Sequence, residues 1–265
     1  MSCCPPTALP PLPTTSEIKP VQMGSATVFF FDNAASDRCV LVFPDVMGVD
    51  SGRTKANCVK LSAYFKVALV EMDTVGGFPD PSAATPWMWP FDGLRQLVAI
   101  FPIMAWIKAR PFETTIRPKI DDTIQYLQSE HRVTKFAAIG YCWGAWMVAK
   151  YSTLEPAKLV CGVSFHPSWR SEDAFHGKGS GAKLAQNICV PQLVLSAQDD
   201  PTWLHPDGEV DKTLQAKPFP SKVRLFPDMN HGWVNRGDLA DHLVAEGVHQ
   251  AWDVEAVPFL QWHLQ

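Results

Sequence analysis

The strongest constraint on the fold is the stretch of residues 136–145, in which an apolar run leads into Gly-x-Cys-x-Gly. The apolar run has the composition of a buried strand, and residues 145–150 have that of a helix. A tight turn between the two has strained backbone angles, and its neighbours on either side must be small for strand and helix to approach each other. The pattern therefore predicts a strand–turn–helix unit with Cys142 at the tip of the turn.

A cysteine in such a turn has two interpretations. As a nucleophile, Cys142 would project above the sheet beside the positive end of a helix, which stabilises a thiolate and offers a backbone N–H to an oxyanion. As a structural residue it would be one more buried thiol, because free cysteine is among the most buried residue types. The motif alone supports both readings equally, so the rest of the chain has to distinguish them.

Composition narrows the class of protein. The chain has 265 residues, enough for one large domain with a sizeable core, and its net charge of −4 without a basic stripe argues against a nucleic-acid partner. Seven cysteines, an odd number, favour reduced thiols and a cytoplasmic location over a disulfide framework. The start of the chain lacks the pattern of a signal peptide, and the longest apolar run, residues 97–107, is too short to span a membrane. We expect no membrane partner.

Strands and helices alternate along most of the chain. Residues 1–15 contain five prolines and predict a flexible arm, and residues 16–265 are expected to form one domain. Strands are expected at residues 26–31, 38–43, 66–72, 136–140, 159–165, 192–197 and 222–226, and helices after Asp50 or Ser51 and at 93–110, 115–131, 145–150, 208–217 and 238–264. This alternation predicts the α/β class, with a doubly wound, mostly parallel sheet and helices on both faces.

Several local features complete this prediction. Residues 26–31 and 38–43 flank a turn-rich linker and suggest an antiparallel strand pair. The helix after them is expected to bury Ala56, Val59 and Ala63. Two further segments are expected to be loops: residues 78–91, rich in proline and tryptophan, and residues 168–181, rich in glycine and serine.

A thiol nucleophile needs a base, and the base needs a third group that fixes its tautomer. Where the nucleophile sits in such a turn, the chain order is nucleophile, acid, histidine. Of the eight histidines, only His166 and His231 follow directly after an expected parallel strand, and only His231 lies downstream of a suitable acid. His231 is therefore the predicted base. Asp200, immediately before a proline, is the predicted acid, with Asp199 as the alternative.

The oxyanion of an acyl-transfer intermediate needs two N–H donors. The sequence offers the backbone of Trp143, directly after the nucleophile, and of Val46, in the loop after an early strand. Asp45 would then lie close to Cys142, where a carboxylate raises the thiol pKa or accepts its proton; a role as a turn residue is equally supported. Trp203 and Trp233 are candidates for lining a substrate pocket, although for each one singly a packing role is favoured.

Together these segments resemble the dienelactone hydrolase family of the α/β-hydrolase fold. The resemblance rests on Pro44-Asp45-Val46-Met47-Gly48, Gly140-Tyr141-Cys142-Trp143-Gly144, Asp200-Pro201 and His231-Gly232-Trp233, and it extends from about residue 20 to the end. Phe165-His166-Pro167-Ser168 and the Cys-Cys-Pro-Pro near the start resemble the eukaryotic branch of this family.

The resemblance implies a Cys–His–Asp triad, an acyl-thiol intermediate, no metal or organic cofactor, and participation of Asp45 in activating the thiol. It also implies arginines that hold a substrate carboxylate. One of these would fall near Gly76-Gly77, where the chain has no arginine, which leaves Arg236 as the expected anion contact and Arg53 as a weaker one.

The first functional hypothesis is a monomeric or homodimeric hydrolase of small lactones or esters that works through Cys142, His231 and Asp200. A second hypothesis keeps the fold and makes the substrate a thioester or aryl ester. A third is a low-turnover binding or redox-responsive protein, because an exposed thiol of low pKa oxidises readily.

Overall fold

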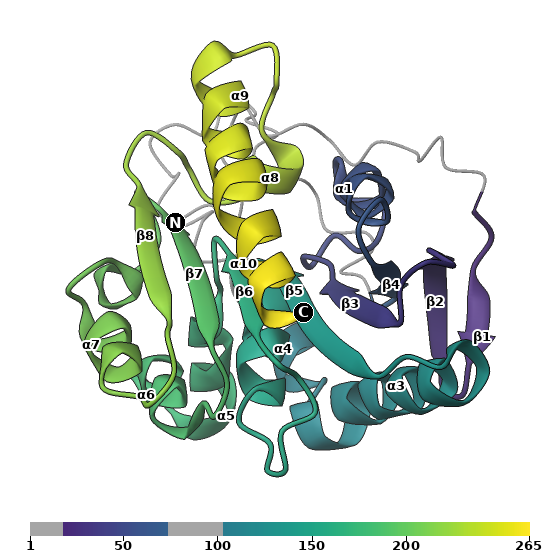
Figure 1. Cartoon of the computed structure of the whole chain (residues 1–265). Helices are drawn as coiled ribbons and strands as arrows, with labels where there is room; N and C mark the ends of the chain where they lie inside the picture. Colours follow the sequence, from purple (N-terminus) through teal and green to yellow (C-terminus); the bar gives the residue numbers. More distant parts are fainter. Residues whose placement is uncertain (1–17, 74–102) are drawn as a thin grey trace, which may run out of the picture.

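The computed structural model describes residues 18–73 and 103–265, which are built around an eight-stranded sheet (Figure 1). The strands are β1 (Val21–Met23), β2 (Ala26–Phe31), β3 (Arg38–Phe43), β4 (Lys66–Val70), β5 (Lys135–Tyr141), β6 (Gly162–Phe165), β7 (Gln192–Ala197) and β8 (Lys222–Phe226). Their order across the sheet is β1-β2-β4-β3-β5-β6-β7-β8. From β4 to β8 neighbouring strands are parallel, and β1 and β2 add an antiparallel edge. The predicted α/β class with a mostly parallel sheet is confirmed.

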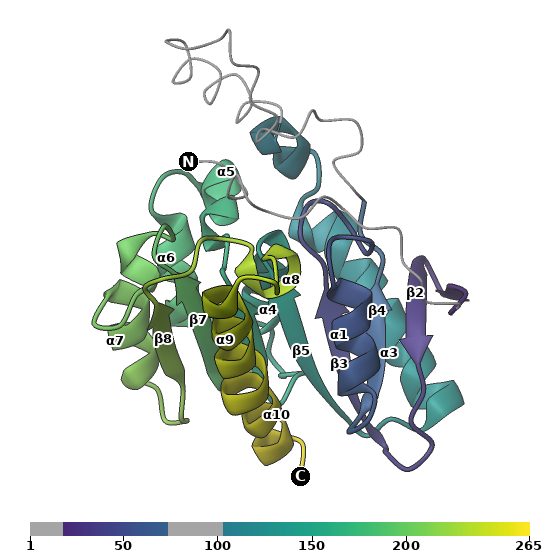
Figure 2. The same ribbon diagram turned by 90° about the horizontal axis from the view of Figure 1, so that it is seen from above.

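Helices cover both faces of this sheet (Figure 2). One face carries α3 (Arg117–His131), α4 (Trp143–Tyr151), α6 (Ser180–Asn187) and α7 (Glu209–Gln215), and the other carries α1 (Thr54–Leu61) and α10 (Val257–His263). Further helical segments are residues 103–108, η2 (Phe112–Ile116), η3 (Trp169–Glu172), α5 (Asp173–His176), η4 (Thr202–Leu204), α8 (Trp233–Arg236), α9 (His242–His249) and η5 (Gln250–Ala256). This two-faced cover confirms the doubly wound arrangement.

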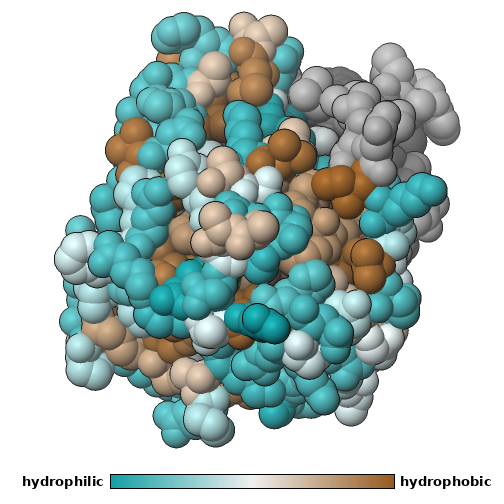
Figure 3. All heavy atoms as spheres, turned by 45° about the vertical axis from the view of Figure 1, so that its right-hand side comes forward, coloured by the Kyte–Doolittle hydropathy of each residue, from teal (hydrophilic) through white to brown (hydrophobic). Residues whose placement is uncertain are grey.

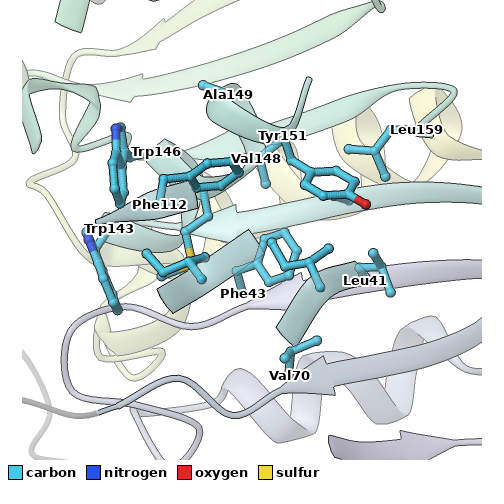
Figure 4. Close-up of a cluster of buried hydrophobic side chains, with 14 of the residues drawn as sticks. Leu41, Phe43, Val70, Phe112, Trp143, Trp146, Val148, Ala149, Tyr151 and Leu159 are labelled. Carbon is cyan, nitrogen blue, oxygen red and sulfur yellow. The ribbon is translucent and has the colours of Figure 1, made fainter. Parts of the chain in front are cut away.

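The central strands are buried on both sides, which explains their continuous apolar sequences. In β3, Cys39, Leu41 and Phe43 point into one hydrophobic cluster, while Val40 and Val42 point into the other. Figure 4 shows part of the first cluster, in which Trp146 of α4 lies beside Phe112 of η2, and Leu41 and Phe43 of β3 lie farther along. Because β3 and β5 are central and pair along their length, the loops that follow them emerge side by side at one edge of the sheet.

The predicted antiparallel pair of strands 26–31 and 38–43 is wrong. β4 lies between them, pairs antiparallel with β2 and runs parallel to β3. A turn-rich linker predicts a reversal of direction, and the chain does reverse there. The linker does not decide whether a third strand enters between the two. That depends on β4, whose apolar sequence is buried along its whole length.

Two local predictions are also corrected. Ala56, Val59 and Ala63 lie on the exposed side of α1 and just beyond it, and the buried face carries polar residues, among them Asn57. Asn57 faces inward because its amide donates a hydrogen bond of 3.1 Å to the Tyr141 hydroxyl. The expected loop 168–181 instead contains η3 and α5 and the start of α6.

Other predictions fall partly or wholly outside the described residues. These are the arm of residues 1–15, the loop of residues 78–91 and most of the helix at residues 93–110.

On the face shown in Figure 3, hydrophilic side chains cover much of the periphery and hydrophobic side chains gather toward the middle. In the part of the chain that the structure describes, no helix combines the length and the apolar character needed to cross a membrane.

Candidate active site

The two glycines around Cys142 are required by close contacts. A Cβ on Gly140 would lie 2.3 Å from the backbone of Gly144, and a Cβ on Gly144 would lie 2.2 Å from the carbonyl oxygen of Phe43. Cys142 itself has a φ of 52° and a ψ of −111°, a backbone conformation that non-glycine residues rarely adopt. The predicted strand–turn–helix unit is therefore present, with Cys142 between β5 and α4.

The histidine predicted as the base lies against the aspartate predicted as its acid. His231 Nδ1 is 2.6 Å from Asp200 Oδ1, and the second carboxylate oxygen of Asp200 accepts the backbone N–H of Ala197 at 2.8 Å. Asp199 accepts the backbone N–H of His231 at 2.7 Å. Both aspartates therefore hold His231, but only Asp200 contacts the imidazole in a hydrogen bond that can fix its tautomer.

Charge favours a protonated His231. Burial alone would lower its pKa, but the nearby charges of Cys142 and Asp200 and hydrogen bonds to both side chains outweigh burial, so the pKa of His231 is raised well above 6.5. A cationic imidazole beside sulfur stabilises the thiolate form of the cysteine. The arrangement can therefore hold a thiolate–imidazolium pair.

Cys142 is enclosed by the segment that follows β6. The thiol sulfur lies 3.3 Å from the hydroxyl oxygen of Ser168, and the backbone N–H of Ser168 donates to the Cys142 carbonyl at 3.0 Å. Cys142 is only 3% exposed. The exposed thiol assumed by the redox-responsive hypothesis is therefore wrong.

Two backbone N–H groups are available where the oxyanion is expected. Trp143 opens α4, and Val46 lies in the loop after β3, next to the Phe43 and Pro44 carbonyls that approach Gly144 closely. Among the described residues, neither the Val46 N–H nor the Trp143 N–H donates a hydrogen bond to another protein group. The chain therefore brings together an unused pair of donors on both sides of the turn.

Asp45 is a buried hub of hydrogen bonds. One carboxylate oxygen accepts the backbone N–H of Met47 at 2.9 Å, and the other accepts the Ser51 hydroxyl at 2.6 Å and the Asn235 amide at 2.8 Å. Asp45 thus ties the loop after β3 to α8, which follows His231. These contacts suit the turn-residue interpretation, and participation of Asp45 in thiol activation stays a prediction.

His166 is a buried neighbour of the base. It has a φ of 36°, is fully buried, and its ring centroid lies 4.8 Å from that of His231. Burial first, and then the charge of His231, hold the pKa of His166 well below 6.5, against the opposing effect of the Asn235 amide. A neutral His166 avoids a second positive charge beside His231.

This burial predicts a pH dependence of stability. Below pH 6.5 the unfolded chain protonates His166 while the folded chain does not, so the free energy of unfolding falls as pH drops, by up to about 1.4 kcal/mol per pH unit. Asparagine tolerates the left-handed backbone of this position. In His166→Asn we expect a correspondingly shallower decline between pH 6.5 and 5, measured by urea denaturation. An unchanged slope would show that the folded chain protonates His166 as readily as the unfolded one.

The residues predicted to bind substrate have different environments. Trp203 is half-buried in η4, directly after Asp200-Pro201, whereas Trp233 is 2% exposed and packs in the core against Phe226 and His166. Arg236 is buried, with 1% of its surface exposed. Binding of substrate by Trp203, Trp233 or Arg236 stays a prediction. Trp203 is the most exposed of the three and therefore the most accessible to a substrate.

Arg53, the weaker candidate for an anion contact, has a structural role. Its guanidinium donates hydrogen bonds to the backbone carbonyls of Val234, at 2.9 Å, and of Gly237. These contacts fix α8, which follows His231. Nothing in this geometry directs the Arg53 charge toward the thiol.

A small hollow beside His231 is lined by Pro167, Ser168, Arg170, Asp199, Asp200, Pro201 and His231. Its volume of about 10 Å³ matches a single water molecule. The hollow can therefore lead water to the imidazole, but it is too small for an acyl group. Within residues 18–73 and 103–265 no group of three or more His, Cys, Asp or Glu side chains is placed to hold a metal ion.

Sequence reasoning assigned no role to His166, Ser168 or Asn235. A usable signal existed for the first two, because both follow a buried parallel strand at the edge of the sheet where ligands collect. Asn235 gave no such signal. Its contact with Asp45 joins residues 190 positions apart.

The fold is that of the α/β hydrolases. The structure resembles a dienelactone hydrolase-like promiscuous phosphotriesterase from metagenomic libraries, with a TM-score of 0.58 and 17% identity over 92% of this chain and 96% of that one. It also resembles an esterase of the bacterial hormone-sensitive lipase family, with a TM-score of 0.59 and 13% identity over 96% of this chain and 87% of that one.

Sequence comparison identifies the family. The model of the dienelactone hydrolase family matches residues 91–262, so the chain belongs to the dienelactone hydrolase family. A carboxymethylenebutenolidase homolog of Xenopus tropicalis is 25% identical over 209 residues, which are 77% of this chain and 73% of that protein. Hydrolase tropI of Talaromyces stipitatus is 26% identical over 151 residues, which are 57% of this chain and 55% of that protein. The chain thus spans little more than half the length of hydrolase tropI.

Proposed function

We propose that this protein hydrolyses small carboxylic esters or lactones, with Cys142 as nucleophile, His231 as general acid and base, and Asp200 as the residue that orients His231. The observation that carries the proposal is the hydrogen bond of 2.6 Å between His231 Nδ1 and Asp200 Oδ1, next to a cysteine in a strained turn. Membership of the dienelactone hydrolase family supports the reaction class.

The reaction begins with attack of the Cys142 thiolate on the substrate carbonyl. The carbonyl oxygen becomes an oxyanion, which the backbone N–H groups of Val46 and Trp143 are placed to bind. As this intermediate collapses, the C–O bond breaks, and the His231 imidazolium gives its proton to the departing alkoxide. The products of this half-reaction are an alcohol and an acyl-thioester on Cys142.

Water then completes the cycle. The neutral His231 removes a proton from water, which attacks the thioester carbonyl and forms a second oxyanion at the same donors. Collapse breaks the C–S bond and releases the carboxylic acid, which leaves the thiolate paired with the imidazolium again. Asp200 keeps Nδ1 protonated in both halves, so that the other ring nitrogen faces the reacting atoms.

A lactone differs from an open ester in one respect. Its alcohol remains tethered to the acyl group after the first half-reaction and can attack the thioester again, so water has to reach the thioester faster than the tethered hydroxyl does. The hollow beside His231, sized for one water and lined by both triad partners of the cysteine, supplies a place for that water. The carboxymethylenebutenolidase homolog among the relatives supports a lactone as the substrate.

The proposal is tested by trapping the intermediate. The wild type and Cys142→Ser are mixed with a panel of activated esters, lactones and acyl thioesters, and release of acid and alcohol is measured together with the mass of the protein. For the wild type we expect a burst of alcohol and an added acyl mass on the peptide that contains Cys142. Turnover without any acyl adduct at Cys142 under rapid quenching would contradict the covalent mechanism. A clear preference for thioesters over lactones would instead favour the second substrate class.

A further inference from the structure

Ser168 is the one hydroxyl that the structure places against the sulfur of Cys142 in its described part. Its Oγ lies 3.3 Å from Sγ, and its backbone N–H donates to the carbonyl of the same cysteine at 3.0 Å. The Ser168 carbonyl in turn accepts the Ser171 N–H at 2.9 Å, which starts η3. Ser168 is therefore fixed through its backbone on both sides, and its hydroxyl is positioned at the nucleophile.

The chain adopts an unfavourable conformation to reach this position. His166, directly after β6, has a φ of 36°, which bends the segment so that Pro167 and Ser168 pass over the turn that carries Cys142. Non-glycine residues rarely adopt such a conformation, because it costs free energy. It persists only where the surrounding structure enforces it. The strained residue immediately precedes the contact with the nucleophile.

We propose that Ser168 is a further catalytic residue, whose hydroxyl donates a hydrogen bond to the Cys142 thiolate and holds it ready for attack. The proposal rests on the proposed function, because it assigns the sulfur to the reacting group. In the resting state the thiolate then has two donors, the Ser168 hydroxyl and the His231 imidazolium. During attack the negative charge moves from sulfur to the carbonyl oxygen, and the Ser168 bond weakens as the oxyanion bonds to Val46 and Trp143 form.

The direction of the hydrogen bond follows from charge. A thiolate has no proton, so its hydroxyl neighbour must donate, whereas a neutral thiol could itself donate to the Ser168 oxygen. The charge of Cys142 contributes to raising the pKa of His231, as expected for a thiolate–imidazolium pair. If Ser168 donates to the thiolate, the hydroxyl lowers the pKa of the Cys142 thiol. If the thiol donates to Ser168, the contact stabilises the neutral thiol and raises that pKa.

The test compares Ser168→Ala with the wild type. Alkylation of Cys142 by iodoacetamide is followed from pH 4 to pH 10 on the peptide that contains Cys142, because only the thiolate reacts. A hydrogen bond to a charged group is strong enough for an effect of roughly tenfold. We therefore expect about tenfold slower alkylation at pH values below the midpoint, and a midpoint that moves upward by about one pH unit. At pH values above the midpoint, the limiting rate should not fall.

The ionisable side chains of the segments around Cys142 are the same in both proteins. They include Asp45 after β3, His166, Arg170 and Glu172 after β6, Asp199 and Asp200 after β7, and Asp228 and His231 after β8. Ser168→Thr keeps the hydroxyl and should keep the midpoint near that of the wild type. Ser164→Ala removes a buried hydroxyl of β6 that has no hydrogen-bond partner in the described part of the chain, and should leave both midpoint and turnover unchanged.

Each outcome decides the proposal. A downward shift in Ser168→Ala would mean that the thiol donates to serine, and an unchanged midpoint would mean a merely structural contact; either overturns the proposal. Ser168→Gly removes the same hydroxyl and serves if the alanine variant does not fold. Alkylation does not depend on substrate. A midpoint shift in a protein that hydrolyses nothing would therefore overturn the proposed function alone, and turnover without a shift would overturn the role of Ser168 alone.

Discussion

Cys142→Ala is expected to lower kcat for ester or lactone hydrolysis by roughly 10³-fold or more, because removal of a nucleophile eliminates the covalent route and leaves only the oxyanion donors and substrate binding. The strained backbone at this position is the same for alanine as for cysteine, so the variant should fold. Steady-state hydrolysis of an activated ester, with thermal unfolding of both proteins, provides the measurement.

Cys189→Ala is the matched control for this experiment. Cys189 is half-buried, and its sulfur contacts the backbone carbonyls of Ser152 and Leu154, at 3.1 and 3.3 Å, at the other end of α4 from the candidate site. Its variant should retain wild-type turnover. Wild-type activity in a folded Cys142→Ala protein would end the nucleophile hypothesis.

Asp200→Asn is expected to lower kcat by roughly 10²- to 10⁴-fold with little change in folding. An amide can donate to Nδ1 of His231, which reverses the tautomer, so that the nitrogen facing the sulfur carries a proton and cannot accept one. The Asp200 charge and hydrogen bond also contribute to the raised pKa of His231. Their loss lowers that pKa, and the alkaline limit of activity should therefore move to lower pH.

Asp199→Asn is the matched comparison in the same loop. The side chain of Asp199 accepts only the backbone N–H of His231 among the hydrogen bonds seen here, and an asparagine oxygen can still accept it. We expect a loss of less than about tenfold, because a neutral acceptor still binds the backbone N–H. The alkaline limit should stay unchanged, because the charges and hydrogen bonds that raise the pKa of His231 come from Cys142 and Asp200. Rates and pH profiles of the two variants are measured on one substrate. Equal losses at both positions would show that Asp200 has no special role in orienting the base.

The sequence predicted the parts of the site that depend on local chain geometry. The turn around Cys142 was predicted from its glycines, because a Cβ at either position would collide with backbone a few residues away or on the next strand. Strands β7 and β8 have the predicted bounds, since their apolar character and flanking residues are local signals. The residues that follow these strands had to meet at one edge of a parallel sheet, and His231 and Asp200 do meet there.

Choices between neighbouring side chains needed the tertiary structure. Asp199 and Asp200 are adjacent in sequence, but opposite orientations of their carboxylates give one the backbone of His231 and the other its imidazole. Nothing in the sequence placed Asn235 and Ser51 on the carboxylate of Asp45. Such contacts join residues on separate elements, and a sequence pattern carries no information about which element packs on which.

The sequence by itself determined the α/β class, the strained turn that carries Cys142, and the order of cysteine, aspartate and histidine along the chain. It did so because sterics within a turn and the burial of whole strands act on neighbouring residues. The tertiary structure alone decided that β4 lies between β2 and β3, that His166 packs on His231, and that the Ser168 hydroxyl faces the sulfur. These outcomes depend on which distant segments exclude water from one another, a property of the packed chain as a whole.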